Sequence, residues 1–182
     1  MKFVETGLEG AYLIELEPIV DARGFFARAF CVNELRQRGL DPTVAQCNVS
    51  TNHRRGTLRG MHYQLPPAAE GKLVRCTRGA IWDAIIDLRP ESATFGRSFG
   101  VELSADNRRA LYVPEMFAHG YLTLTDDAEV HYMVTEPYSP GSEAGLRYDD
   151  AAFGVEWPIE VEVISDKDAA WPLWAERQES CA

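Results

Sequence analysis

The chain of 182 residues has no long apolar stretch, no block of like charge and no glycine-, serine- or proline-rich linker. Its apolar runs are only a few residues long, whereas a helix needs about 20 apolar residues to span a bilayer. The amino terminus lacks the apolar core of a signal peptide. We therefore expect one domain over residues 1–182, in the cytoplasm and without a membrane partner.

Cysteine is scarce and scattered. The chain has four, at Cys31, Cys47, Cys76 and Cys181, and none belongs to a Cys-x-x-Cys pair. This pattern excludes the usual zinc-binding spacings and a disulfide framework. We expect reduced thiols.

Basic residues are outnumbered, and the net charge is −10. A nucleic acid is thereby excluded as a partner, because a phosphate backbone needs a basic face. Many arginines and lysines nevertheless lie before residue 80, while acidic residues accumulate later. A positive pocket inside an acidic shell suits a small phosphorylated ligand; the alternative is a solvated charged face.

Short β-branched segments alternate with turn-forming residues about every 8–12 positions, which is typical of a β-sandwich or barrel. One short helix is predicted over residues 32–39, with Asn33 as a candidate cap and Gly39 as its stop. The carboxy-terminal run is expected to wrap the sandwich and to end in a frayed tail over about residues 175–182. The predicted strands are residues 11–16, 72–76, 80–88, 98–103, 110–113 and 129–135.

Residues 56–64, Gly-Thr-Leu-Arg-Gly-Met-His-Tyr-Gln, hold the strongest chemical signal, together with Lys72. Histidine can move a proton near neutral pH, arginine grips phosphate, and lysine can stabilise an oxyanion. Strand alternation points His62 inward and Arg59 outward, so both reach one site only if Gly60 hosts a bulge. By the same alternation Tyr132 points inward with two valines.

A short-strand barrel with an inward histidine resembles a cupin, and cupins often bind metal. The metal pattern needs two histidines one residue apart on a strand, but the second position here is Gln64. His119 is a candidate later ligand, yet no carboxylate follows His62 at ligand spacing. We therefore expect no metal and no other cofactor, with acid-base groups in their place.

Most of the chain resembles, in the same order, the nucleotide-diphospho-4-keto-6-deoxysugar 3,5-epimerases, typified by the dTDP-4-dehydrorhamnose 3,5-epimerase family. The resemblance implies an all-β jelly-roll cupin barrel, or β-sandwich, with a few short helices, working as a homodimer without metal. The matching segments are residues 21–26, 56–67, 72–76, 87–89, 113–114, 117–120, 132–138 and 165–168.

The resemblance also implies a mechanism, in which protons on the carbons beside a C4 ketone are removed and replaced. His62 is then the base, and Asp168 holds its other ring nitrogen. Tyr132 returns a proton from the opposite face, and Lys72 faces the enolate oxygen. The substrate implied is a nucleotide-diphosphate sugar, most simply dTDP-4-dehydro-6-deoxyglucose.

Further matched positions are implied to bind the nucleotide. Arg23 and Arg59 would grip the diphosphate, with His119 nearby and oriented by Asp83. The base and its sugar would meet the remaining positions, with Tyr138 stacking on the base and Phe26 adding an apolar wall. These remaining positions are Gln46, Asn48, Tyr138, Glu143, Lys167 and Phe26.

The chain departs from the family pattern at three positions. Arg28 stands where a glutamate usually contacts the nucleoside, so an acceptor has become a donor and the identity of the nucleotide is open. Met61 and Met116 replace a common leucine and glycine, and alter pocket shape more than chemistry.

Four alternatives remain open from the sequence. One is a C3-only or C5-only epimerase, with CDP or GDP as the nucleotide carrier. Another is a sugar-nucleotide ketoisomerase on the same barrel. A third is a cupin that binds a sugar nucleotide without catalysis, and a metal-dependent cupin oxygenase is the fourth.

Overall fold

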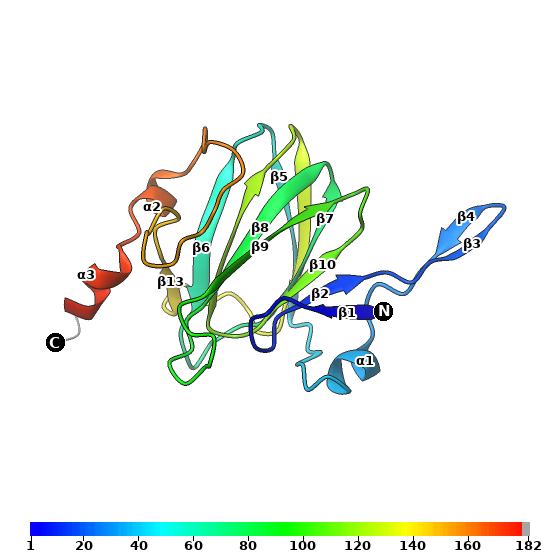
Figure 1. Cartoon of the computed structure of the whole chain (residues 1–182), viewed down its shortest axis with the longest axis horizontal. Helices are drawn as coiled ribbons and strands as arrows, with labels where there is room; N and C mark the ends of the chain where they lie inside the picture. The colour runs from blue at the N-terminus through cyan, green and yellow to red at the C-terminus, as the bar shows by residue number, and fades with distance from the viewer. Residues whose placement is uncertain (180–182) are drawn as a thin grey trace.

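The computed structural model of the chain describes residues 1–179 and contains two antiparallel sheets that face each other, as Figure 1 shows. We call the six-stranded sheet the first sheet and the five-stranded sheet the second. In the first, the order is β1 (Lys2–Glu5), β2 (Tyr12–Glu15), β10 (Ala110–Val113), β7 (Lys72–Arg78), β12 (Ala128–Val134) and β5 (Gln46–Asn52). In the second, it is β13 (Glu143–Gly145), β6 (Leu58–Gln64), β11 (Phe117–Thr123), β8 (Ala80–Asp87) and β9 (Ser98–Ser104).

The main core fills the space between the two sheets. Val74 and Val130 of the first sheet and Ile85 of the second are wholly buried in it. Alternating side chains of each strand point inward, as expected for a sandwich. Tyr132 packs against this core, and Val130 and Val134 are both buried. The predicted inward direction of Tyr132 is therefore confirmed.

A second core covers the outer face of the second sheet. Met61 and Ile86 of the sheet pack with Leu146 and Phe153, which belong to the segment after β6's partner strand β13. Trp157 and Trp174 also pack against this core, so the prediction that the carboxy-terminal run wraps the sandwich is confirmed. Because the second sheet is covered on both faces, every residue of β11 is buried.

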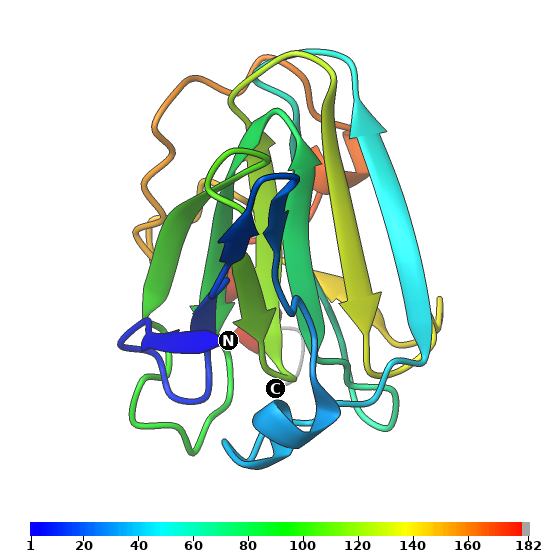
Figure 2. The ribbon, with the colours of Figure 1, turned by 90° about the vertical axis from the view of Figure 1, so that its right-hand side faces the viewer.

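A two-stranded hairpin, β3 (Ile19–Asp21) and β4 (Gly24–Phe26), projects away from the sandwich on the side opposite the carboxy-terminal helices (Figure 1). We call residues 19–26 the arm. Ile19, Val20, Phe25 and Phe26 are all exposed, with Val20 at 75% and Phe26 at 71%. Figure 2 shows the first sheet from the side of the arm, with β5 at its edge.

The short helix α1 (Val32–Arg36) lies below the arm and buries Leu35 against the outer face of the first sheet. Its N-cap is Cys31, without a side-chain hydrogen bond, so the expected cap at Asn33 is wrong. The helix ends at Arg36 with Gln37 as its C-cap, three residues before the predicted end, and Gly39, with a φ of 71° in the left-handed region, lies in the turn that follows.

All of the predicted strands are present with small shifts at their ends, whereas β1, the arm, β5, β11 and β13 were not predicted as strands. Two short helices follow near the carboxy terminus, α2 (Asp166–Ala169) and α3 (Trp174–Glu179). The tail expected to fray over about residues 175–182 thus starts within α3, and residues 180–182 lie outside the described residues. No helix among residues 1–179 is long and apolar enough to cross a membrane.

Asp87, at the end of β8, holds the neighbouring loop through a buried carboxylate. Its oxygens accept hydrogen bonds from Arg89, Ser92 and Thr94 at 2.6–2.7 Å. Burial alone would raise the pKa of Asp87, but these donors outweigh it and lower the pKa from 3.8 to about 2. A lowered pKa in the folded state stabilises the fold above pH 4, and this contribution disappears as the pH falls towards 2.

We therefore predict that Asp87→Asn lowers the free energy of unfolding at pH 7 by about 2 kcal/mol or more. Urea unfolding followed from pH 7 down to pH 2 should show the gap between the two proteins narrowing below pH 4. The exposed pair of Asp149 and Arg147 offers a control, since Asp149→Asn should change stability far less. A gap independent of pH would contradict the assignment.

Candidate active site

A cavity of about 520 Å³ opens between the two sheets, with walls drawn from both. The second sheet and the α2 segment supply Arg59, His62, His119 and Asp168. Facing them, the first sheet supplies residues of β5, β7 and β12. The lining also includes Gln46, Asn48, Ser50, Tyr63, Gln64, Glu70, Lys72, Tyr121, Tyr132, Val134, Tyr138, Glu143, Ser165 and Lys167.

Gly60 carries the irregularity that brings Arg59 and His62 to the same cavity. Between β6 and β11 the register shifts: His62 pairs with His119, but Arg59 pairs with Tyr121. Three steps along β6 thus match two along β11, which is a bulge. Gly60 has a φ of 138°, and a Cβ there would meet Cα of Gly120 at 2.5 Å. The predicted bulge is therefore confirmed, and only glycine fits it.

His62 forms a hydrogen-bonded pair with Asp168, which is only 5% exposed. The distance from His62 Nε2 to Asp168 Oδ1 is 2.7 Å, and the second oxygen accepts from the Gly60 amide at 3.3 Å. Burial raises the pKa of Asp168, but the bond to His62 and the Gly60 amide outweigh it, so the net pKa is lowered. An ionised Asp168 keeps the proton of His62 on Nε2 and leaves Nδ1 as the basic nitrogen.

Asp168 is fixed by the first turn of α2. Ser165 is the N-cap, and its hydroxyl accepts from the Asp168 amide at 3.1 Å. The serine thereby satisfies an amide that has no partner within the helix. The sequence Ser-Asp-Lys-Asp thus sets the carboxylate against β6.

Lys72, 7% exposed, lies on β7 of the first sheet. Its ammonium lies 3.2 Å from the carboxylate of Glu70 and donates to the carbonyl of His62 at 3.3 Å. An ammonium has three donors, so one remains for a ligand. Glu70 was not predicted, although its position two residues before Lys72 could have suggested a strand-end partner.

Tyr132 lines the same cavity from β12, on the sheet opposite His62. Burial raises the pKa of its phenol, with Tyr121 and Glu70 adding to the rise and Arg59 opposing it. The phenol therefore stays protonated at neutral pH and can donate a proton. The structure thus places a phenol and an imidazole on facing walls of one cavity.

A chain of hydrogen bonds positions Arg59 across the sheets. Its Nε donates to Asn52 Oδ1 at 2.7 Å, Asn52 donates to the hydroxyl of Tyr121 at 3.3 Å, and Tyr121 donates to Ser50 at 2.9 Å. None of these three partners was predicted, and single positions in strands gave no signal for them. The remaining guanidinium nitrogens of Arg59 are left for an anion.

His119 lies on β11, and its ring contacts that of Tyr121. The residue is buried, with 8% of its surface exposed. Its Nε2 is 3.1 and 3.0 Å from the two oxygens of Asp83, which is wholly buried on β8. The expected orientation of His119 by Asp83 is thus present. Asp83 lies behind the histidine and does not line the cavity.

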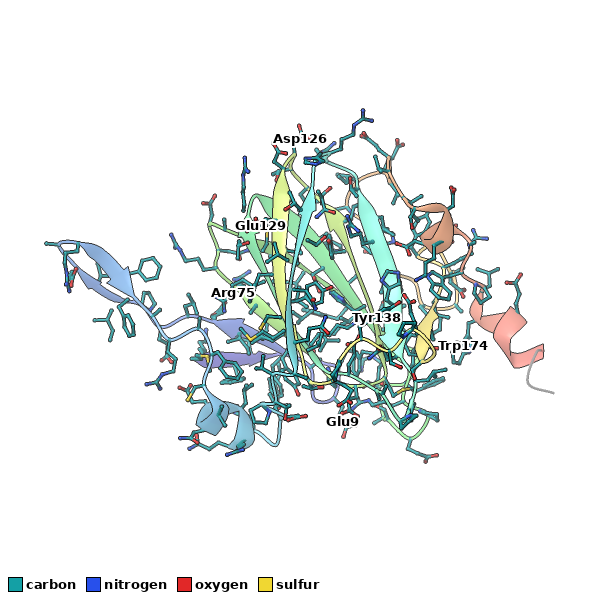
Figure 3. All side chains as sticks on the ribbon, turned by 180° about the vertical axis from the view of Figure 1, so that it is seen from behind. Glu9, Arg75, Asp126, Glu129, Tyr138 and Trp174 are labelled. Atoms are coloured by element: carbon teal, nitrogen blue, oxygen red, sulfur yellow. The ribbon has the colours of Figure 1, made fainter. Side chains whose placement is uncertain are left out.

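The rim of the cavity is a connected group of polar residues. Glu143 accepts two bonds of 2.7 Å from Lys167 and one of 2.8 Å from the Tyr138 hydroxyl. Gln46 donates to Asn48 at 2.7 Å on the facing β5. Figure 3 shows Tyr138 on the β6 side of the sandwich, far from the arm. All five residues line the cavity together.

Gln64, at the position where a metal-binding cupin would place its second histidine, is a structural residue. Its amide nitrogen donates to the carbonyls of Ala68 and Pro137 at 2.9 and 3.3 Å, and its oxygen accepts from the Ser139 amide at 2.6 Å. It thereby joins two loops at the cavity rim. Residues 1–179 contain no group of three histidine, cysteine or acidic side chains that could hold a metal.

Three expected substrate-binding residues do not reach this cavity, which corrects the prediction for a single chain. Arg23 lies on the arm and is paired with Asp21, and Phe26 is exposed on the same arm. Arg28 follows the arm and pairs with Glu34 of α1 at 2.8 Å. The arm extends from the sandwich, so no residue of it lines the cavity.

Comparison with known proteins places this geometry in a family. Residues 5–176 match the family model described as dTDP-4-dehydrorhamnose 3,5-epimerase. A protein of that name from Methanothermobacter thermautotrophicus is 43% identical, over 93% of this chain and 92% of its own length.

Solved structures agree. The enzyme of the same name from Elizabethkingia anophelis is 36% identical with a TM-score of 0.94, covering 97% of this chain and 98% of that one. The Bacillus anthracis enzyme, with TDP and PPi bound, is 41% identical with a TM-score of 0.89, covering 94% and 98%. With the family model matching nearly its whole length, this chain belongs to the dTDP-4-dehydrorhamnose 3,5-epimerase family.

Proposed function

We propose that the protein epimerises a nucleotide-diphosphate 4-keto-6-deoxysugar, converting dTDP-4-dehydro-6-deoxyglucose to dTDP-4-dehydrorhamnose. The observation that carries this proposal is the placement of His62, with Asp168, and of Tyr132 on facing walls of one cavity. Inversion of a carbon needs a base on one side and an acid on the other. Lys72 adds a cation beside them.

The reaction starts with a proton on a carbon beside the C4 ketone. His62 takes this proton through Nδ1, and Asp168 stabilises the imidazolium that forms. The electron pair moves onto the ketone oxygen, where the free N–H of Lys72 stabilises the enolate. Tyr132 then donates its proton to the opposite face of the carbon. Solvent takes the proton from His62 and restores that of Tyr132, so each carbon ends inverted with no net change in the enzyme.

We assign the nucleotide to the part of the cavity that is lined by Arg59, His119 and the rim residues. Arg59 and His119 would meet the diphosphate, and the rim group of Gln46, Asn48 and Tyr138 the nucleoside. A relative with TDP bound supports thymine as the base. The cytoplasmic location expected from the sequence stays a prediction.

The arm supports a homodimer. A two-stranded hairpin is marginally stable by itself, and exposed apolar residues such as Val20 and Phe26 favour association. Its Arg23 and Phe26 are the expected nucleotide-binding residues that the chain's own cavity lacks. We infer that the arm of one protomer reaches the cavity of its partner, which brings Arg23, Phe26 and Arg28 to the nucleotide.

Mixed dimers test this arrangement. Arg23→Ala damages only the arm and Lys72→Ala only the cavity, so each variant alone should be nearly inactive. When the two variants are unfolded, mixed and refolded together, half of the dimers contain one chain of each kind. In each mixed dimer, one of the two sites combines the intact cavity of one chain with the intact arm of the other. We predict recovery of about a quarter of wild-type activity. No recovery, with mixed dimers detected by mass spectrometry, would show that each arm serves its own chain.

The function itself is tested with dTDP-4-keto-6-deoxyglucose in deuterium oxide, with C3 and C5 followed by proton NMR. Exchange and inversion at both carbons is the expected result. Exchange at one carbon alone would identify a single-site epimerase, and a 3-keto product a ketoisomerase. If the sugar linked to dTDP, CDP or GDP shows no exchange at either carbon, the protein is not an epimerase of this kind, and a protein that only binds sugar nucleotides remains.

A further inference from the structure

Trp171 lies directly beside the base, although the resemblance did not assign it a role. The centroids of its indole and the His62 ring are 6.3 Å apart, with the planes at 68°, an edge-to-face arrangement. The ammonium of Lys167, a rim residue, lies 5.7 Å from the indole centroid. The indole therefore lies next to both the His62 ring and a residue of the cavity rim.

The α2 segment delivers Asp168 and Trp171 together. Asp168 lies in α2, and Trp171 follows directly after Ala170, the C-cap of this helix, so one short segment carries both side chains. Asp168 fixes one nitrogen of His62, and Trp171 packs against the ring itself. The carbonyl of Pro172 accepts a hydrogen bond from the Arg147 amide at 3.4 Å, which connects the end of this segment to the residues that follow β13.

Gly145 makes the space for the indole. It pairs with His62 across β13 and β6, so the two residues are direct neighbours in the second sheet. A Cβ on Gly145 would overlap the Cε2 and Cδ2 atoms of Trp171. The glycine thus lets the indole lie flat on the backbone next to the imidazole.

Packing, and not a hydrogen bond, holds the indole in place. Its Nε1 is buried and, within the described part of the chain, has no hydrogen-bond partner, which is unfavourable for a buried donor. The indole also makes no hydrogen bond to His62, so it occupies neither imidazole nitrogen. One nitrogen bonds Asp168, and the other is left for the substrate.

We propose that Trp171 is a positioning residue for His62, restricting rotation of the imidazole and excluding water from its outer side. The inference rests on the proposed role of His62 as the base. It concerns the geometry of proton removal and not the affinity for substrate, because Trp171 does not line the cavity.

Kinetics of Trp171→Ala and Trp171→Phe with dTDP-4-keto-6-deoxyglucose test the proposal. For Trp171→Ala we expect kcat to fall about tenfold while KM stays within about twofold, since misplacing a reacting group costs rate and not binding. Trp171→Phe, which keeps a flat ring against His62, should recover most of the rate. NMR relaxation of the His62 ring should show it rigid in the wild type and more mobile in Trp171→Ala, while Asp168 keeps the same tautomer in both proteins.

Trp82 is a matched control, because its Nε1 is likewise buried without a partner among residues 1–179 and its ring packs on a glycine, Gly100. It lies on β8, outside the cavity, so Trp82→Phe should keep the wild-type kcat. If Trp171→Ala folds poorly, Trp171→Leu supplies apolar volume without the ring and is measured instead.

The outcomes separate the two proposals. An inactive wild type overturns the proposed function. An active wild type, with unchanged kcat and unchanged mobility of the His62 ring in the alanine or leucine variant, overturns the role of Trp171 alone. A fall in kcat of the same size in Trp82→Phe would also overturn it, because the effect would then be a general loss of stability.

Discussion

His62→Asn should abolish exchange at both C3 and C5 of the substrate, with a loss of rate of at least about 10³-fold. Asparagine preserves a polar side chain near Asp168, but it has no basic nitrogen. Because the same imidazole serves both carbons, the two exchange reactions should disappear together. Proton NMR in deuterium oxide measures both in one sample.

The control for this variant is His53→Asn, which removes an exposed imidazole that is paired with Asp127 and does not line the cavity. It should keep wild-type exchange at both carbons. Binding of dTDP, measured by calorimetry, should be similar in all three proteins. Exchange at the wild-type rate in His62→Asn would rule out this histidine as the base.

Tyr132→Phe should separate proton removal from inversion. The base and the lysine remain, so His62 can still remove a proton and let it exchange with solvent. Without the phenol, the opposite face has no donor, and we expect inversion to fall about 10²–10³-fold. The measurement compares deuterium incorporation into recovered substrate with formation of the inverted product.

Tyr112→Phe is the matched control. Burial also raises the pKa of Tyr112, to about 12, but its hydroxyl bonds the backbone of Asp41 outside the cavity. Its loss should leave both exchange and inversion unchanged. Were Tyr132→Phe to invert substrate as fast as the wild type, another group would have to be the acid.

Much of the fold was predictable because its central strands alternate or are continuously apolar and end at clear turns. The segments 80–88 and 129–135 match β8 and β12 to within a residue at each end. By contrast, β11 was not predicted as a strand. The sequence Phe-Ala-His-Gly-Tyr-Leu-Thr is buried on both faces, so it lacks the alternation that marks a half-exposed strand.

The cavity could be predicted only where residues matched a known pattern or obeyed strand parity. The bulge at Gly60 followed from parity, because Arg59 and His62 lie on opposite faces of a regular strand. Glu70 and Asn52 carry no such signal, since their roles depend on which strands become neighbours. The sequence predicts only that Trp171 belongs to a segment covering the sandwich. Its position beside His62 depends on the pairing of Gly145 with His62, which the sequence does not show.

The arm shows a different limit. The family pattern includes Arg23 and Phe26 among substrate-binding residues, but one chain does not bring them to its own cavity. The sequence alone does not show whether a residue reaches the cavity of its own chain or that of a second chain. Exposure of Ile19, Val20 and Phe26 becomes visible only when the arm is placed against the body of the same chain.

The most direct test is a crystal structure of the protein with dTDP or a dTDP-linked sugar bound. We predict the sugar between His62 and Tyr132, with its C4 oxygen within hydrogen-bond distance of Lys72 and Arg23 of a second protomer at the diphosphate. A sugar outside this cavity, or both side chains on one face of its ring, would contradict inversion by these two residues.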